Sequence, residues 1–438
     1  MAGPHVAVSE SGGIIGGRQR RYRRSYFALI SSSFVSNTGN AFSNLAIPLF
    51  VLATTGSATR TGIVAFVNYA PPVVAAIFGG ALVDRIGRRR TLMTADALSC
   101  IATALIPLCY MADLLSFPLL LALVAFGAFL DSPGRAARTS MIPALADGAG
   151  YSPERAQSLS MSGFFLSQVI GPALAGLVVA ASGPTTAIWV NAATFVVSLL
   201  IVKNVVQEPE INVPANESTY LEDLREGFHF VWHDGFMRAM IILASAFSMV
   251  FIPLYTVLYP VYFTRLIGST RALGFFLGAE AAGNLIGAVA YGYIGERFSR
   301  FHAFIFSMAA WVPFFAVMLF TPPVWLILVS GFVASLVSGA INPIFQVAFQ
   351  VRTPEAMRPR VYSMVTAGNL MAVPVGALLI GPLIELIGVI PTLGIVVAMG
   401  AAAPIVCYLV PVFREIDHEI EITEPAPAAD ERAFEPVA

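Results

Sequence analysis

The chain has 438 residues, of which 57% are hydrophobic and 12% are charged, and its formal net charge is −1. An ordinary soluble domain carries about 25% charged residues. This balance excludes a soluble globular enzyme, a disordered chain and a nucleic-acid-binding protein, and it predicts an all-α protein that crosses a membrane many times.

The first 24 residues are polar and end in five arginines, and the uncharged run 25–59 follows at once. This run is too long for a cleaved signal peptide, so we predict a basic tail (1–24) and an uncleaved first span. The three cysteines lie in apolar runs and show no metal-binding spacing. We therefore expect no disulfide framework, no metal site and no cofactor.

Twelve spans are predicted from the distribution of charge. A helical span needs about 20 apolar residues. Gly183-Pro184 and Thr321-Pro322-Pro323 divide two long uncharged runs, because such residues favour turns, and three further runs are each interrupted by one acid. The runs are 25–59, 61–83, 91–112, 114–134, 156–202, 239–264, 272–295, 303–351, 361–384 and 386–413.

The predicted organisation is two six-helix bundles with a linker between them. The bundles cover 25–206 and 238–413, the linker covers 207–237, and the acidic tail 414–438 is expected to be disordered. An even number of spans places both termini on one side. Because 22 of the 25 Lys and Arg residues fall on that side, we expect both termini in the cytoplasm and the chain in the cell (inner) membrane.

The two halves also repeat each other. Gly56 and Gly62 recur 212 residues later as Gly268 and Gly274, and the Gly183 turn recurs 205 residues later. Parallel repeats about an axis along the membrane normal are a transporter architecture, with the substrate bound between the halves. The expected fold is therefore twelve transmembrane helices in two pseudo-symmetric six-helix bundles.

A glycine- and arginine-rich loop joins the second and third predicted spans. It reads Gly80-Ala-Leu-Val-Asp84-Arg85-Ile-Gly87-Arg88-Arg89-Arg90. Gly87 suits a tight turn, the arginines hold the loop in the cytoplasm, and Asp84 can pair at a helix end. A plain positively charged turn is the alternative interpretation.

This loop resembles the signature loop of the major facilitator superfamily. The resemblance implies a conformational lock in which Asp84 pairs with Arg138 and which opens when the cytoplasmic side opens. Its residues are Gly80, Asp84, Arg85, Gly87, Arg88 and Arg138.

A second motif lies in the fifth predicted span. Gly171, Pro172 and Gly176 follow Ser167 at small-residue spacing, which lets helices approach closely, and the proline bends the helix. The segment resembles the Gly-Pro motif of exporters in the same superfamily and favours export over uptake. Ordinary helix packing is the alternative.

Further segments resemble the Tap-type multidrug efflux pumps of actinobacteria and related macrolide and siderophore exporters. They include Ala95–Ser99, Phe228–Trp232 and Tyr259–Phe263. The resemblance implies a monomeric antiporter, not an enzyme, that exchanges protons for small amphipathic drugs such as tetracyclines and aminoglycosides, in contact with membrane lipids. The alternative is a siderophore or lipid-like metabolite exporter. Relatives often carry an acid where Asn40 follows Gly39 here.

Two acids inside the predicted spans are candidate proton carriers. A charged group at a helix centre costs about 2.5 to 3.5 kcal/mol on insertion scales, so Glu280 and Asp131 need a reason to be there. For Glu280 a static hydrogen bond or a cation contact is the alternative. For Asp131 the alternative is an ion pair with Arg135. Asp113 and Glu385 are expected near the outer ends, in water.

Polar residues spaced along one face of several spans are candidates to line a central cavity. Interhelical hydrogen bonding is an equally good interpretation of each. The candidates are Asn37, Asn40, Asn44, Tyr255, Tyr259, Asn284, Asn342 and Gln346. In the linker, 219–233 is predicted to form an amphipathic helix on the inner membrane surface, with Phe228 and Trp232 on its apolar face.

Overall fold

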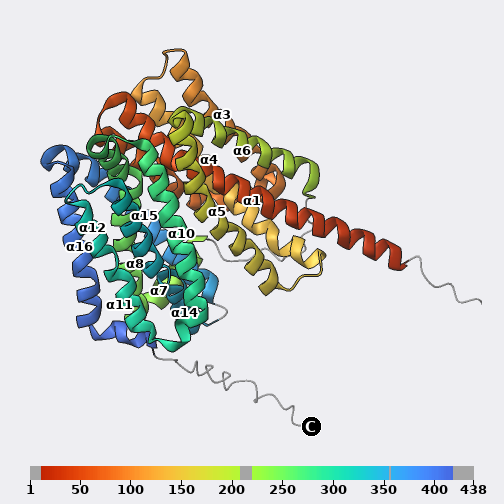
Figure 1. Cartoon of the computed structure of the whole chain (residues 1–438). Helices are drawn as coiled ribbons and strands as arrows, with labels where there is room; N and C mark the ends of the chain where they lie inside the picture. The colour runs from red at the N-terminus through yellow and green to blue at the C-terminus, as the bar shows by residue number, and fades with distance from the viewer. Residues whose placement is uncertain (1–10, 208–219, 355–356, 418–438) are drawn as a thin grey trace, which may run out of the picture.

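The computed structural model describes residues 11–207, 220–354 and 357–417, and every regular element within these ranges is helical (Figure 1). Ten of the described helical segments are long and apolar enough to cross a membrane. α1 is not among them because Ser and Asn residues lower its hydropathy. Most of the predicted tail 414–438 lies outside the described residues.

The first half of the chain forms six helices. Gly87 and Gly183 separate two pairs of them, with φ of 91° and 85°, a backbone conformation that favours glycine. The predicted break at Gly183-Pro184 is therefore confirmed. The helices are α1 (Ser11–Thr55), α2 (Ala58–Ile86), α3 (Arg88–Met111), α4 (Phe117–Gly148), α5 (Pro153–Ser182) and α6 (Pro184–Val205).

The first helix is longer than the predicted span, because it begins at Ser11 within the predicted basic tail. The Gln19 side-chain amide donates to the carbonyl oxygen of Ala149 over 3.3 Å. Tyr26 is fully buried, and its hydroxyl donates to the carbonyl oxygen of Ala156. The start of α1 therefore packs against the turn between α4 and α5.

The second half contains more breaks than predicted. The expected break at 321–323 is present, but the flanking runs are each divided once more. Pi-helical turns follow Pro253, which cannot donate a backbone hydrogen bond. The elements are α7 (Tyr220–His233), α8 (Gly235–Pro253), η1 (Leu254–Leu258), α9 (Tyr259–Tyr262), η2 (Phe263–Ile267), α10 (Thr270–Ile294), η3 (Gly295–Arg297), α11 (Arg300–Ala309), α12 (Trp311–Met318), α13 (Val324–Ser338), α14 (Ile341–Arg352), α15 (Arg358–Ile387), α16 (Val389–Leu409) and η5 (Pro411–Asp417).

The turns at the repeated glycines share one local geometry. Gly56 and Gly268 have φ of 65° and 71°, and each is followed by a serine that caps the next helix. Gly183 and Gly388 have φ of 85° and 91°. Each is the N-cap residue of the next helix, α6 or α16, and no side chain caps that helix start. The sequence repeat thus corresponds to a repeat of backbone conformation.

The two halves meet through α2 against α15 and α5 against α10, and Figure 1 shows the red-to-olive helices of the first half beside the green-to-blue helices of the second. Glycines allow the close approach. A Cβ added at Gly176 would lie 2.5 Å from the Cα of Gly274, and one added at Gly62 would lie 2.6 Å from the carbonyl oxygen of Ala377. These two contacts hold the halves together at one end.

The linker helix α7 is present, and Val231 and the partly buried Phe230 pack against the core, whereas Phe228 and Trp232 face outward. Phe228 and Trp232 stack with ring centroids 5.1 Å apart and are 44% and 48% exposed. Glu226 binds Arg360 at 2.6 Å, which ties α7 to the start of α15. The aromatic pair is therefore about half exposed, as is typical of a helix at a membrane interface.

Candidate functional site: a cavity between the two halves

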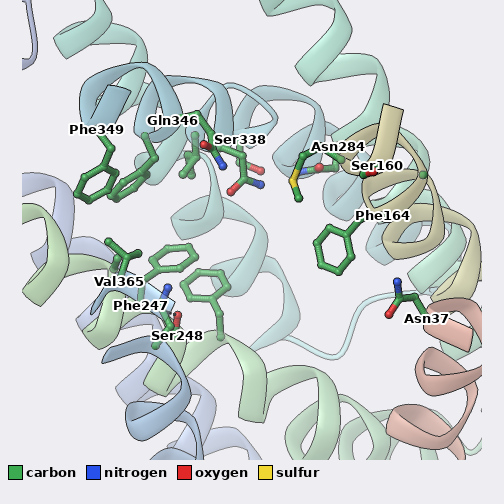
Figure 2. Close-up of a pocket in the computed structure, with 18 of the residues that line it drawn as sticks. Asn37, Ser160, Phe164, Phe247, Ser248, Asn284, Ser338, Gln346, Phe349 and Val365 are labelled. Atoms are coloured by element: carbon green, nitrogen blue, oxygen red, sulfur yellow. Dashed lines mark hydrogen bonds between the residues drawn. The ribbon is translucent and has the colours of Figure 1, made fainter. Parts of the chain in front are cut away.

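A cavity of about 800 Å³ lies between the two halves of the chain. Its walls come from α1, α4 and α5 on one side and from α8 and α10–α15 with η1 on the other. Figure 2 shows Asn37 and Phe164 of the first half across from Phe247, Asn284 and Gln346 of the second. A site of this size can enclose a drug-sized molecule.

Most of the predicted cavity residues line this space. Asn37, Tyr255, Asn284, Asn342 and Gln346 all contribute to its wall. Asn342 and Gln346 come from one face of α14, as their spacing suggested. The polar part of the wall is therefore largely amide and hydroxyl groups, which both donate and accept hydrogen bonds.

Three predicted cavity residues lie elsewhere. Asn40 and Asn44 line a separate cavity of about 150 Å³ inside the first half. Tyr259 is fully buried and packs edge-to-face on Tyr255, with centroids 5.2 Å apart, and on Phe276. It therefore packs behind Tyr255 and does not line the cavity.

An aromatic wall was not anticipated from the sequence. Phe247 and Phe251 stack with centroids 3.7 Å apart, and Phe251 meets Trp311 edge-to-face at 5.3 Å. All three line the cavity, together with Tyr255. The spacing of 247, 251 and 255 along α8 and η1 was the available signal, since residues four apart share a helix face. Such a wall offers large apolar contacts of adaptable geometry.

Glu280 is a buried acid beside the cavity. It lies on α10 one turn before Asn284, and its side chain is 3% exposed. Tyr255 and Tyr259 are the neighbouring phenols. Among the described residues, neither carboxyl oxygen has a hydrogen bond of ordinary geometry. The Tyr255 phenol interacts with this carboxyl group, but burying an acid away from water is still costly, so the position suggests a functional role.

Arg138 is held by a buried network in the first half. Its guanidinium lies 3.2 Å from Asp96 and 3.2 Å from the Ser198 hydroxyl, which itself donates to Asp96 over 2.7 Å. Arg138 is 6% exposed and Asp96 is 4% exposed. The Asp84 side chain lies outside the described part of the structure, so its predicted pairing with Arg138 stays a prediction.

The remaining motif residues occupy turns and helix contacts. Arg88, which directly follows the Gly87 turn, donates to the carbonyl oxygen of Ser140 on α4 over 3.1 Å, and Arg85 is exposed. Gly80 lies within α2, and its surroundings are outside the described part of the structure. Gly171 faces α1, since a Cβ there would lie 2.7 Å from that of Ala41, and Pro172 lies within α5.

The end of the molecule opposite the termini is closed by contacts between the halves. Glu385 on α15 accepts hydrogen bonds from the Ser57 hydroxyl at 2.6 Å, from the Thr59 backbone nitrogen at 3.0 Å and from the Thr59 hydroxyl. Arg265 donates to the Gly56 carbonyl oxygen across the same boundary. Glu385 is exposed, in agreement with the expectation of a solvated acid, and its carboxylate also satisfies donors at the start of α2.

We expect Glu385→Ala to loosen this end. Losing an acceptor at a helix start costs about 1 kcal/mol, which corresponds to a roughly fivefold change in a conformational equilibrium. A cysteine at buried Thr61, in a background without the three native cysteines, should then react several-fold faster with a water-soluble maleimide. Asp113→Asn neutralises an exposed acid at the same end, where φ of 55° suits asparagine, and is the control. If the cysteine at position 61 reacts equally fast with Glu385 intact, with Glu385→Ala and with the Asp113 control, the Glu385 contacts do not hold this end closed.

Comparisons with known proteins agree with this architecture. The model of the Major Facilitator Superfamily matches residues 29–279 and 254–435. The multidrug efflux pump Tap of Mycolicibacterium fortuitum is 31% identical over 395 residues, which are 89% of this chain and 96% of that protein. The enterobactin exporter EntS of Shigella flexneri is 27% identical over 81% of this chain and 84% of its own length.

A solved structure shows the same fold. The nucleoside transporter NupG superposes with a TM-score of 0.71 at 12% identity and covers 87% of this chain and 97% of its own. At this identity the likeness concerns the fold alone.

Proposed function

The chain belongs to the major facilitator superfamily, and we propose that it exports amphipathic drugs in exchange for protons by alternating access. It is a membrane transporter and not an enzyme, as its family and its relatives indicate. In this proposal α1 and α2 join the ten apolar segments to make twelve spans in two pseudo-symmetric six-helix bundles. Both termini lie in the cytoplasm of a cell whose inner membrane the protein crosses.

The observation that carries the proposal is the composition of the central cavity. Its aromatic side chains and uncharged amides suit large amphipathic molecules of varied shape, because neither group demands a fixed charge on the ligand. The names of the relatives, a multidrug efflux pump and an enterobactin exporter, point to export. Gly171, Pro172 and Gly176 resemble an exporter motif and support the same direction.

Alternating access requires each end of the cavity to open in turn. We propose that the Glu385 contacts and the Gly176–Gly274 approach close the extracellular end in the conformation described. In this account Asp84 and Arg138, with Gly80, Arg85, Gly87 and Arg88, close the cytoplasmic end in the opposite conformation. Each conformation is then stabilised by polar contacts that the other lacks.

Glu280 is the better of the two candidate proton carriers. Asp131 already pairs with Arg135, whose guanidinium lies 3.1 Å away, as the sequence suggested. The Glu280 carboxyl is buried beside Tyr255, which lines the cavity, so a bound substrate and a proton on Glu280 can influence each other. Protonation removes the cost of a buried charge, and deprotonation requires access to water.

Transport by inverted membrane vesicles tests this function. Vesicles that contain the protein should accumulate a tetracycline when a proton gradient is imposed, and a protonophore should abolish the accumulation. Vesicles without the protein are the control. Accumulation that survives the protonophore would contradict proton coupling, and drug uptake by intact cells would contradict export.

A siderophore exporter is a second candidate, favoured by the two arginines in the cavity wall. Arg135 and Arg138 both border the central cavity, and guanidinium groups bind carboxylate or catecholate oxygens well. In the same vesicles an anionic catecholate siderophore would then compete with the drug. Competition at micromolar concentration would favour this candidate, and its absence would favour amphipathic drugs.

A further inference from the structure

The small cavity in the first half is a separate polar chamber. It has a volume of about 150 Å³ and lies among α1, α2, α3, α4 and α6. A water molecule occupies about 30 Å³ in the liquid, so the space can hold an ion with some of its hydration shell. Its wall includes Asn40, Asn44, Asn68, Ser99 and Asp131.

The wall is rich in oxygen ligands. The Asn40 amide donates to an Asp131 carboxylate oxygen over 3.3 Å, and the Asn68 amide donates to the Asn44 oxygen over 2.9 Å. Ser99 is 1% exposed, and its hydroxyl has no hydrogen-bond partner among the described residues. A buried hydroxyl of this kind indicates a ligand or water beside it.

The charge of the chamber selects the kind of ligand. Asp131 is the carboxylate in its wall, and the described residues contain no group of three His, Cys, Asp or Glu that could hold a metal ion. One carboxylate with neutral amide and hydroxyl oxygens suits a monovalent cation better than a divalent one, which usually takes several charged ligands.

Arg135 connects this chamber to the central cavity. Its guanidinium pairs with Asp131, its side chain is 51% exposed, and it lines both cavities. An exposed ion pair contributes little stability, so the side chain can leave Asp131 for the central cavity at small cost. Asp131 then needs another cation to balance it.

We propose that the small chamber binds Na⁺ at Asp131, with Ser99 and the asparagine oxygens as further ligands, in exchange for the Arg135 side chain. Na⁺ and Arg135 compete for one carboxylate, so ion binding moves a positive charge into the wall of the central cavity. The site is distinct from Glu280 on α10. Its tests measure Na⁺ binding rather than transport, so a failure of this proposal can be told apart from a failure of drug export coupled through Glu280.

Direct binding to the purified protein in nanodiscs tests the proposal. Radioactive ²²Na⁺ should bind saturably, and NaCl should raise the unfolding temperature relative to choline chloride at equal ionic strength. Asp131→Asn should abolish both effects, and Ser99→Ala should weaken binding about tenfold. Asp147→Asn, which changes an exposed acid on the same helix, is the matched control and should bind as the unmodified protein does.

Arg135→Gln separates the exchange from simple binding. Removal of the competing guanidinium should tighten ²²Na⁺ binding several-fold, whereas a merely structural Arg135 would weaken it or leave it unchanged. The proposal is overturned if Na⁺ and choline stabilise the protein equally, if Asp131→Asn retains ²²Na⁺ binding, or if Arg135→Gln fails to tighten it.

Discussion

Glu280→Gln is expected to abolish proton-coupled drug transport while substrate binding changes by less than about threefold. Glutamine fills the same volume on α10 and keeps a polar group near Tyr255, but it cannot exchange a proton. Drug-driven proton movement in proteoliposomes, followed with a pH-sensitive dye, measures the first effect. Quenching of Trp311, which lines the cavity, measures drug binding.

Asn284→Ala is the matched control for Glu280→Gln. Asn284 lies one turn further along α10 and lines the cavity, so its loss should weaken drug binding. The number of protons exchanged for each drug molecule should stay unchanged. If Glu280→Gln keeps full proton movement, Glu280 is not the carrier and Asp131 becomes the remaining candidate.

Neutralising one member of the Arg138–Asp96 pair should destabilise the protein by roughly 3 to 5 kcal/mol, because a buried charge is left without its partner. Asp96→Asn and Arg138→Met should each lower the unfolding temperature strongly. The double variant should recover most of the loss, since the site then contains no charge. Thermal unfolding of the three purified variants measures this coupling.

Substitution of Asp84 tests the proposed lock. If Asp84 pairs with Arg138 in the other conformation, Asp84→Asn should reduce transport with little effect on thermal stability. Asp84→Glu, which keeps the carboxylate, should retain most of the transport that Asp84→Asn loses. A fully active Asp84→Asn would remove the lock from the mechanism.

Much of the helical layout could be predicted because it depends on local sequence. Gly183-Pro184 ends one helix and begins the next through backbone preferences that need no tertiary contact. The extension of α1 to Ser11 was missed because it depends on contacts with the distant turn after α4, such as that of Gln19 with Ala149.

The polar cavity residues were easier to predict than the aromatic ones. Asn37 and Asn284 are costly in lipid, which restricts them to the interior of the bundle. Phe247 and Phe251 are equally compatible with lipid, a protein core or a cavity wall, so composition cannot place them. The contacts of Glu385 were not predicted because its partner Ser57 lies 328 residues away, and only the fold brings them together.

Distances between spin labels at the two ends of the molecule test alternating access most directly. In a background without native cysteines, one label pair at Leu114 and Phe320 reports on the closed end, and one at Ser158 and Phe298 reports on the other; all four positions are exposed. Bound drug should lengthen the first distance and shorten the second, whereas acidic pH, which keeps the buried Glu280 neutral, should favour the described conformation and change both distances in the opposite sense. Distances that stay fixed, or that change in the same direction at both ends, would contradict the account.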